Sequence, residues 1–284
     1  MTAAPTTPGP TLPDFDGPDA DLPFTAVTRT LFLASQPRTG SSLLSRALWD
    51  TGQMGRPWEY LGAVHVAAFH QRWALPYGRS QLRTLTNPLE RVIRGRLGLP
   101  FTAGMAIGLA QWTAADVRDY LNRIEAVRTT ANGLFAVKAH YEQVETVLLR
   151  RSLTPEDVWP DVRYVWLVRE DTLRQAVSFV RAKQTSAWTA ADRTRKAATY
   201  DRAAIDAALK DIARWDRDWA AFLAPRPTAL RIRYEDVRSD LPSALAAVFA
   251  HLGVAPPSRW PQPAMSRQSD DTTDQWMERY KAGH

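Results

Sequence analysis

The sequence predicts an α/β fold with a central, mainly parallel sheet that is flanked by helices. Four short apolar runs are typical of strands buried in a parallel sheet. The segments between them are helical or far longer than a hairpin, as crossover connections between parallel strands require. With 45% hydrophobic residues, a chain of 284 residues can bury a sizeable core as one domain. We expect a flexible leader over residues 1–27, rich in Pro, Thr, Asp and Gly, and a single domain over residues 28–284.

The expected strands and helices alternate along the chain. The strands are expected at residues 31–34, 134–139, 163–168 and 229–234. Helical spacing of apolar residues predicts a helix that starts near residues 39–42 and ends around 51–52, and further helices at 114–129, over much of 203–223 and at about 241–252. Another helix follows Asp171, which can cap it, with Leu173, Ala176, Val177 and Val180 on its core face. Residues 155–161 are expected as a loop and the residues after 252 as a polar tail. Prolines interrupt residues 62–112, where we expect an excursion that binds an acceptor.

An arginine, a glycine and two serines follow the first strand, where the next helix begins. Gly40 permits backbone conformations closed to other residues, and a helix N-terminus offers unpaired N–H groups at the positive end of the helix dipole. Ser41 and Ser42 add hydroxyl donors, and Arg38 adds a fixed charge. The segment is therefore interpreted as an anion-binding loop, with a tight strand-to-helix connection as the alternative. It lacks the lysine and the glycine spacing of a nucleotide P-loop, which disfavours a kinase or GTPase.

Polar residues also follow the other strands. In a parallel sheet the ligand lies beyond the carboxyl ends of the strands, which makes residues 36–42, 138–140, Arg169 and 234–236 candidate walls of a site. Arg169 stands where a buried strand ends, on the same segment as Ser178. An arginine fork with a hydroxyl can hold a second phosphate, so the two loops together suit a ligand with two separate anionic groups.

These segments resemble a known family. SQPRTGSSLL (35–44) resembles the 5′-phosphosulfate loop of sulfotransferases, and VWLVREDTLRQAVSFVRAKQTSAW (165–188) resembles their 3′-phosphate segment. The pattern is most similar to the bacterial trehalose 2-sulfotransferase family, with Pro-x-Glu-aromatic at 57–60 and Gln-Thr-x-x-Trp at 184–188. FAVKAHY (135–141), RIRYEDV (231–237) and SRQSDDTTDQWMERY (266–280) also resemble this family. The resemblance covers most of the chain from Leu31 onward.

The resemblance implies a P-loop-like sulfotransferase fold and a PAPS-dependent sulfotransferase, which transfers the sulfuryl group of 3′-phosphoadenosine 5′-phosphosulfate (PAPS) to an alcohol and leaves the bisphosphate product PAP. The implied ligands of the 5′-phosphosulfate are Arg38, Thr39, Gly40, Ser41, Ser42 and Leu43. Arg169 and Ser178 would hold the 3′-phosphate, and Arg267 and Gln268 would help to close over the nucleotide. Many sulfotransferases have a lysine where Arg38 stands; arginine keeps the positive charge toward the leaving group but cannot donate a proton.

Transfer to a hydroxyl also requires a base. The resemblance and the sequence both favour Glu59, whose neighbours Trp58 and Tyr60 are expected to desolvate it and raise its pKa toward neutrality. The alternative is a surface glutamate in a turn. His140 is the rival base, unless it is a core histidine with satisfied hydrogen bonds. The pair Glu235 and Asp236 is expected to cap and order the helix that it begins.

The remaining expectations concern partners. A net charge of +6 suggests anionic partners, while dispersed arginines argue against nucleic acid; a P-loop-like kinase and a nucleic-acid-binding protein remain as alternatives. The acceptor is expected to be a small molecule with a hydroxyl, a sugar or a natural product, against which Trp58, Trp73 and Trp112 could stack. With no cysteine, no metal-ligand spacing, no apolar span and no signal core, we expect a cytoplasmic protein without a metal or a membrane segment. The resemblance implies a homodimer.

Overall fold

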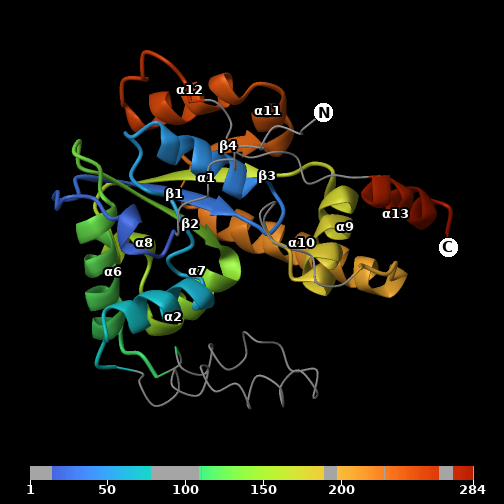
Figure 1. Cartoon of the computed structure of the whole chain (residues 1–284), viewed down its shortest axis with the longest axis horizontal. Helices are drawn as coiled ribbons and strands as arrows, with labels where there is room; N and C mark the ends of the chain where they lie inside the picture. The colour runs from blue at the N-terminus through green and yellow to red at the C-terminus, as the bar shows by residue number, and fades with distance from the viewer. Residues whose placement is uncertain are drawn as a thin grey trace, which may run out of the picture.

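The protein has a four-stranded parallel sheet with helices on both faces, as predicted (Figure 1). The computed structural model describes residues 15–77, 109, 111–188, 197–226, 228–261 and 271–283. The strands are β1 (Arg29–Ser35), β2 (Leu134–His140), β3 (Val162–Val168) and β4 (Leu230–Arg233). Their spatial order is β2-β1-β3-β4, and all neighbours are parallel. The carboxyl end of β1 therefore lies between those of β2 and β3.

The five helices expected from apolar spacing are present, together with further helices for which no bounds were predicted. The helices of the described ranges are α1 (Ser41–Asp50), α2 (Ala63–Arg72), α6 (Ala114–Arg128), α7 (Tyr141–Val147), α8 (Pro155–Val158), α9 (Thr172–Thr185), α10 (Arg202–Leu223), α11 (Tyr234–Ser239), α12 (Leu241–Leu252) and α13 (Asp271–Lys281), with 3-10 turns at Pro18–Ala20 and Leu149–Arg151. None of the helices in these ranges combines the length and apolar character that a bilayer crossing requires.

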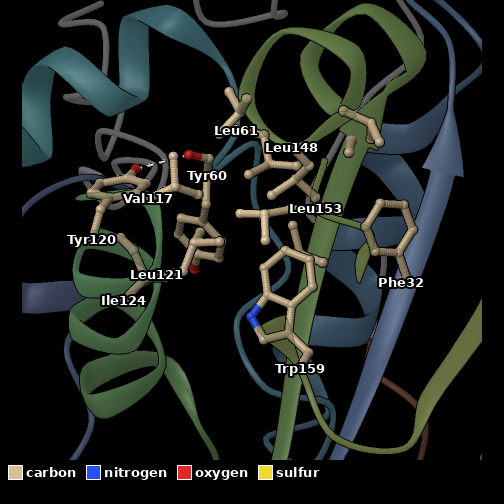
Figure 2. Close-up of a cluster of buried hydrophobic side chains, with 14 of the residues drawn as sticks. Phe32, Tyr60, Leu61, Val117, Tyr120, Leu121, Ile124, Leu148, Leu153 and Trp159 are labelled. Carbon is tan, nitrogen blue, oxygen red and sulfur yellow. Dashed lines mark hydrogen bonds between the residues drawn. The ribbon is translucent and has the colours of Figure 1, made fainter. Parts of the chain in front are cut away.

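Alternate residues of β1 enter different cores, because successive side chains of a strand point to opposite faces. Leu31 and Leu33 pack with α1, α11 and α12 on one face. Phe32 and Ala34 pack on the other face with aromatic residues that include Tyr60 and Trp219. Figure 2 shows part of this second core, where Tyr60 lies among side chains of α6 such as Tyr120 and Leu121. The sheet is thus buried on both sides, which explains why its strands are continuous apolar runs.

Two expectations about irregular segments are wrong. Residues 155–161 contain α8, whose start is closed by a capping box between Thr154 and Asp157. The tail contains α13, which buries Trp276 and Met277 against α9 and α10. α13 also contacts α9 through polar side chains. Arg174 of α9 pairs with Asp274 at 2.6 Å, and Arg181 of α9 donates to Thr273.

The described part of the leader, residues 15–27, packs against the domain. Ala20 is fully buried, and the N–H of Leu22 donates to the carbonyl of Val127. Asp21 pairs with Arg72 of α2 and with the buried Arg128 of α6. Acidic residues in this segment therefore neutralise cations on two helices.

Candidate active site

The loop after β1 is shaped by two residues in the left-handed region. Arg38 has φ of 66° and Gly40 has φ of 78°. A Cβ at Gly40 would lie 2.2 Å from the ring of Tyr234, so this position requires glycine for space as well as for conformation. Gly40 is the N-cap of α1, and no side chain caps that helix. The first N–H groups of α1 are therefore available to a ligand.

Side chains of helices α9 and α10 fix this loop through hydrogen bonds. The amide of Gln36 donates to Asp216 at 2.5 Å and accepts from Gln175 at 3.3 Å. Gln175 also donates to the carbonyl of Pro37, and Trp219 donates to the carbonyl of Ser35. Thr39 is buried, and its hydroxyl donates to the carbonyl of Gln36 at 2.8 Å. Thr39 therefore shapes the loop from inside, through its side chain.

On the β3 side of the loop, three of the predicted site residues meet. Arg38 donates through Nε to the hydroxyl of Ser178 at 2.8 Å, and also to the carbonyl of Trp188 at 2.5 Å. Arg169 donates through Nη1 to the carbonyl of Arg38 at 2.9 Å and lies over the ring of Tyr234. The Nε of Arg169 is buried and has no hydrogen-bond partner among the described residues. A buried donor without a partner is costly, and a ligand anion would satisfy it.

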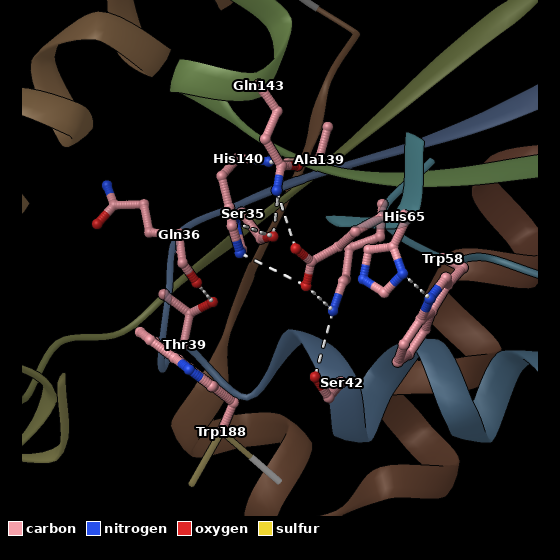
Figure 3. A network of polar contacts seen from close by, with 12 residues as sticks. Ser35, Gln36, Thr39, Ser42, Trp58, His65, Ala139, His140, Gln143 and Trp188 are labelled. Atoms are coloured by element: carbon pink, nitrogen blue, oxygen red, sulfur yellow. Dashed lines mark hydrogen bonds and ion pairs between the residues drawn. The ribbon is translucent and has the colours of Figure 1, made fainter. Parts of the chain in front are cut away.

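On the β2 side of the loop, a polar network surrounds Glu59. Figure 3 shows Ser42, His140 and Gln143 of this network. Lys138 Nζ lies 2.7 Å from Glu59 Oε1 and donates to Ser42 Oγ at 3.2 Å. Gln143 donates to Glu59 Oε2 at 2.9 Å, and His140 Nε2 lies 3.7 Å from Oε1. Backbone pairing holds the segment in place, since the N–H of Lys138 donates to the carbonyl of Trp58. Glu59 is thus tied to the end of β2, and it is not a surface residue in a turn.

The predicted rise of the Glu59 pKa is wrong. Burial does raise the pKa of this carboxyl, but the positive charge of Lys138 and its hydrogen bond outweigh burial and hold the pKa well below its ordinary value. Tyr60 points into the core instead, where its hydroxyl donates to the carbonyl of Arg56. Glu59 is therefore ionised at neutral pH. Burial lowers the pKa of His140, so its imidazole is neutral there.

The three tryptophans expected to stack on an acceptor have other neighbours. Trp112 is 3% exposed and packs against Tyr77 and Tyr120 in the core. Trp73 packs against Phe69 and Tyr120 in the same core. Trp58 lies in the site, but Phe15 stacks on its ring at 3.9 Å between centroids. The prediction of stacking on an acceptor is therefore wrong for Trp112, which is buried. Trp73 is only partly buried, so for that residue stacking stays a prediction.

The structure brings together most of the predicted site residues, at one edge of the sheet. The loop residues 38–43 lie between Arg169 with Ser178 on one side and Glu59 with His140 on the other. Glu235 accepts from the N–H groups of Glu170 and Asp171, and so orders the start of α9. The expected cap on its own helix is wrong, because α11 has no side-chain cap hydrogen bond. Arg267 and Gln268 lie outside the described residues. No group of three potential metal ligands occurs in the described ranges.

Sequence reasoning missed several supporting residues. Gln143 and Asp216 lie inside helices outside the recognised segments, so no local signal marks them. Gln175 lies inside the recognised segment 165–188 but was given no role. Lys138 was placed at a strand end but received no role. Its burial at 1% exposure, beside a carboxylate, is the feature that the sequence did not reveal.

The loop after β1, with an uncapped helix start, thus lies between the cations Arg38 and Arg169 on one side and the ionised carboxylate of Glu59 on the other. The chain belongs to the Stf0 sulphotransferase family, whose model matches residues 30–283, and it is therefore a sulfotransferase.

Two relatives and one solved structure illustrate the similarity. Trehalose 2-sulfotransferase of Mycolicibacterium smegmatis is 30% identical, over 89% of this chain and 94% of that protein. Trehalose 2-sulfotransferase of Mycobacterium tuberculosis is 28% identical, over 90% of this chain and 96% of that protein. The sulfotransferase domain from the curacin biosynthetic pathway is 17% identical, with a TM-score of 0.47 over 88% of this chain and 83% of that one.

Proposed function

We propose that this sulfotransferase takes its sulfuryl group from PAPS and transfers it to a sugar hydroxyl, with trehalose as the first candidate acceptor. The observation that carries the proposal is the position of the loop after β1. The cluster of Arg38, Arg169 and Ser178 lies on its β3 side, and Glu59 lies on its β2 side. A donor with two anionic groups fits the first side and the loop, which leaves the second side for the acceptor.

The residues present fit this donor. Arg169 is largely buried and carries an unpartnered Nε, so it is a donor held ready for an anion beside the loop carbonyl that it already binds. The first turn of α1 has no side-chain cap, and Ser41 and Ser42 stand at that turn. We infer that Arg169 and Ser178 hold the 3′-phosphate, while residues 38–43 hold the 5′-phosphosulfate.

The chemistry needs one proton acceptor. When bound, the donor supplies an activated sulfuryl group on its 5′-phosphate. Glu59 accepts the proton of the acceptor hydroxyl as that oxygen forms its bond to sulfur, and the bond between sulfur and the phosphate oxygen breaks. The loop N–H groups and Arg38 neutralise the charge that the departing phosphate gains. No redox partner is needed, because the sulfuryl group moves intact.

Glu59 and His140 are both placed to act as the base. Glu59 is ionised and fixed by two hydrogen-bond donors, Lys138 and Gln143. His140 is neutral, and its Nδ1 lies 3.3 Å from Ser35 Oγ. We assign the proton transfer to Glu59, since its carboxylate is ionised and is held beside Ser42 by Lys138.

The acceptor class is supported by a pocket beside Glu59. It is lined by Gln36, Pro37, His140, Tyr141, Glu142, Gln143 and Trp215. Several of these side chains are hydrogen-bonding groups, and Trp215 provides an aromatic wall whose Nε1 donates to Glu142 at 2.9 Å. Such a mixture suits a sugar with many hydroxyls better than an acyl chain. Both relatives named above are trehalose 2-sulfotransferases, which makes trehalose the first acceptor to test.

The test is transfer of labelled sulfuryl from PAPS to a panel of trehalose, other disaccharides, monosaccharides and phenols. We expect a labelled sugar ester, with trehalose among the accepted compounds. Thermal-shift measurements should show stabilisation by PAP but not by ATP with magnesium or by an oligonucleotide. Stabilisation by ATP with magnesium alone would favour a kinase, and salt-sensitive oligonucleotide binding would favour a nucleic-acid-binding protein. The implied homodimer is tested separately by sedimentation.

A further inference from the structure

Lys138 is a buried lysine shared between two parts of the site. It lies near the end of β2 with a side chain that is 1% exposed. Its ammonium contacts the carboxylate of Glu59 at 2.7 Å and the hydroxyl of Ser42 at 3.2 Å, and it lies 5.0 Å from the centre of the Trp58 ring. Burying an ammonium costs free energy unless charged or polar groups surround it. The contacts with Glu59 and Ser42 therefore hold the Lys138 ammonium in its position.

The position of Lys138 complements that of Arg38. The guanidinium of Arg38 reaches away to Ser178 and Trp188, on the β3 side of the loop. Lys138 reaches the first turn of α1 from the β2 side, because Leu33 of β1 pairs with Lys138 in the parallel register. Lys138, from the neighbouring strand β2, therefore provides an ammonium at the first turn of α1. The loop sequence itself has no lysine there.

Two anions compete for this ammonium once the proposed donor binds. One is the Glu59 carboxylate, and the other is the sulfuryl end of the donor next to Ser42. A lysine ammonium is a compact charge on a flexible stem, with three N–H donors that can change partners. We propose that Lys138 pairs with Glu59 before the donor binds and turns toward the sulfuryl group afterwards, which frees Glu59 to accept the acceptor proton. The inference rests on the proposed donor.

The exchange links donor binding to base strength. While paired with Lys138, Glu59 is a weak base, because the ion pair stabilises its charged form. After the exchange the carboxylate remains buried but faces less positive charge, so its pKa rises. The other titratable groups near it are His140 from the end of β2 and His65 from α2. Base activation would thus follow donor binding, which favours an order in which the donor enters before the acceptor reacts.

Equilibrium binding of PAPS and PAP without acceptor tests the exchange by calorimetry. Glu59→Gln should bind PAPS about three- to tenfold more tightly than the wild type, since Lys138 no longer has to leave a carboxylate. Lys138→Met should bind PAPS at least about tenfold more weakly, through loss of a charge-assisted hydrogen bond. Affinity for PAP, which lacks the sulfuryl group, should stay within about threefold in both variants. Lys210→Met, an exposed lysine on α10, is the matched control and should change neither affinity.

A second readout is the pH dependence of kcat/KM for PAPS in Lys138→Met, which reports the free enzyme. Its acid limb should move to higher pH, because in the free variant Glu59 stays buried without the ammonium. Unchanged or weaker PAPS binding by Glu59→Gln would overturn the exchange, as would equal losses of PAPS and PAP affinity in Lys138→Met. The Glu59→Gln result decides alone if Lys138→Met does not fold. Wild-type protein that binds neither nucleotide would refute the proposed donor itself, and the exchange with it.

Discussion

Replacing Glu59 with glutamine removes a proton acceptor while changing the shape of the site very little. In the native site Oε1 faces Lys138 and Oε2 accepts from Gln143. The amide oxygen of glutamine can keep the contact with Lys138, but its NH₂ then meets the NH₂ of Gln143. Gln143 cannot simply reverse its amide, because its oxygen accepts from the N–H of His140 at 3.0 Å. The substitution therefore loses about one hydrogen bond.

The expected effects on stability and on rate differ in size. One lost hydrogen bond costs about 0.5–1.5 kcal/mol of folding free energy, so the variant should remain folded. A general base contributes about 10²–10⁴ in rate, which corresponds to about 2.7–5.5 kcal/mol of barrier. We therefore expect kcat to fall by at least about a hundredfold, while PAP affinity stays within about threefold. Steady-state transfer of labelled sulfuryl and calorimetry with PAP measure the two quantities.

Two further variants make this result decisive. Glu145→Gln removes a carboxylate from the surface of α7, where its side chain is 46% exposed, and it should leave kcat unchanged. His140→Asn tests the rival base. A kcat of Glu59→Gln within about threefold of the wild type would refute the assignment, and a collapse confined to His140→Asn would move the base to that residue.

Three other predictions address the donor loop and the pH dependence of stability. Arg169→Ala should weaken PAP binding by about 10–100-fold in calorimetry, because a buried guanidinium beside the loop is lost. Gly40→Ala should lower both the melting temperature and PAP affinity, since its Cβ would lie 2.2 Å from the Tyr234 ring at a φ of 78°. Burial raises the pKa of Glu125 to about 7 from an ordinary 4.5, so the folded state binds the extra proton between these values. The stability of the folded state therefore falls as pH rises from about 4.5 to 7, because the buried Glu125 must lose its proton. Urea unfolding should show that Glu125→Gln is more stable than the wild type at pH 8 but not at pH 4.

Each of these predictions has a control or a contradicting result. Arg163→Ala, at the opposite end of β3, should leave PAP affinity unchanged, and an equal loss there would show that Arg169 acts through general charge. Gly52→Ala shares the left-handed conformation, with φ of 70°, but its Cβ would meet nothing within 4 Å. It should cost less than Gly40→Ala. Equal pH dependence of stability in Glu125→Gln and the wild type would contradict the assigned pKa.

Much of the fold could be predicted because its signals are local. The apolar runs of β1 to β4 and the helical spacing of α6, α10 and α12 are readable within a few residues. The signals for α8 and α13 are weaker, since α8 is a single turn inside a loop. The polar surface of α13 hides Trp276 and Met277, which become a core only when α9 and α10 lie beside them.

The candidate site divides in the same way. Residues that lie together in one segment, such as Arg38 to Leu43 and Arg169 with Ser178, carry motifs that can be recognised. Partners from distant segments do not, and Lys138 is 79 positions from Glu59, since 138 minus 59 is 79. The direction of the Glu59 pKa shift was therefore predicted wrongly: the adjacent aromatic residues were visible in the sequence, and the distant ammonium was not.

Local sequence was sufficient for the strands, the position of the loop after β1, the family and the choice of Glu59 as a candidate base. The strand order β2-β1-β3-β4 and the register of β1 with β2 are properties of the folded chain, because strand pairing is decided by how the whole core packs. That packing places Lys138 against Glu59 and Ser42, turns Arg38 toward Ser178, and buries Trp112 in the core. The chemical state of the carboxylate follows from those contacts.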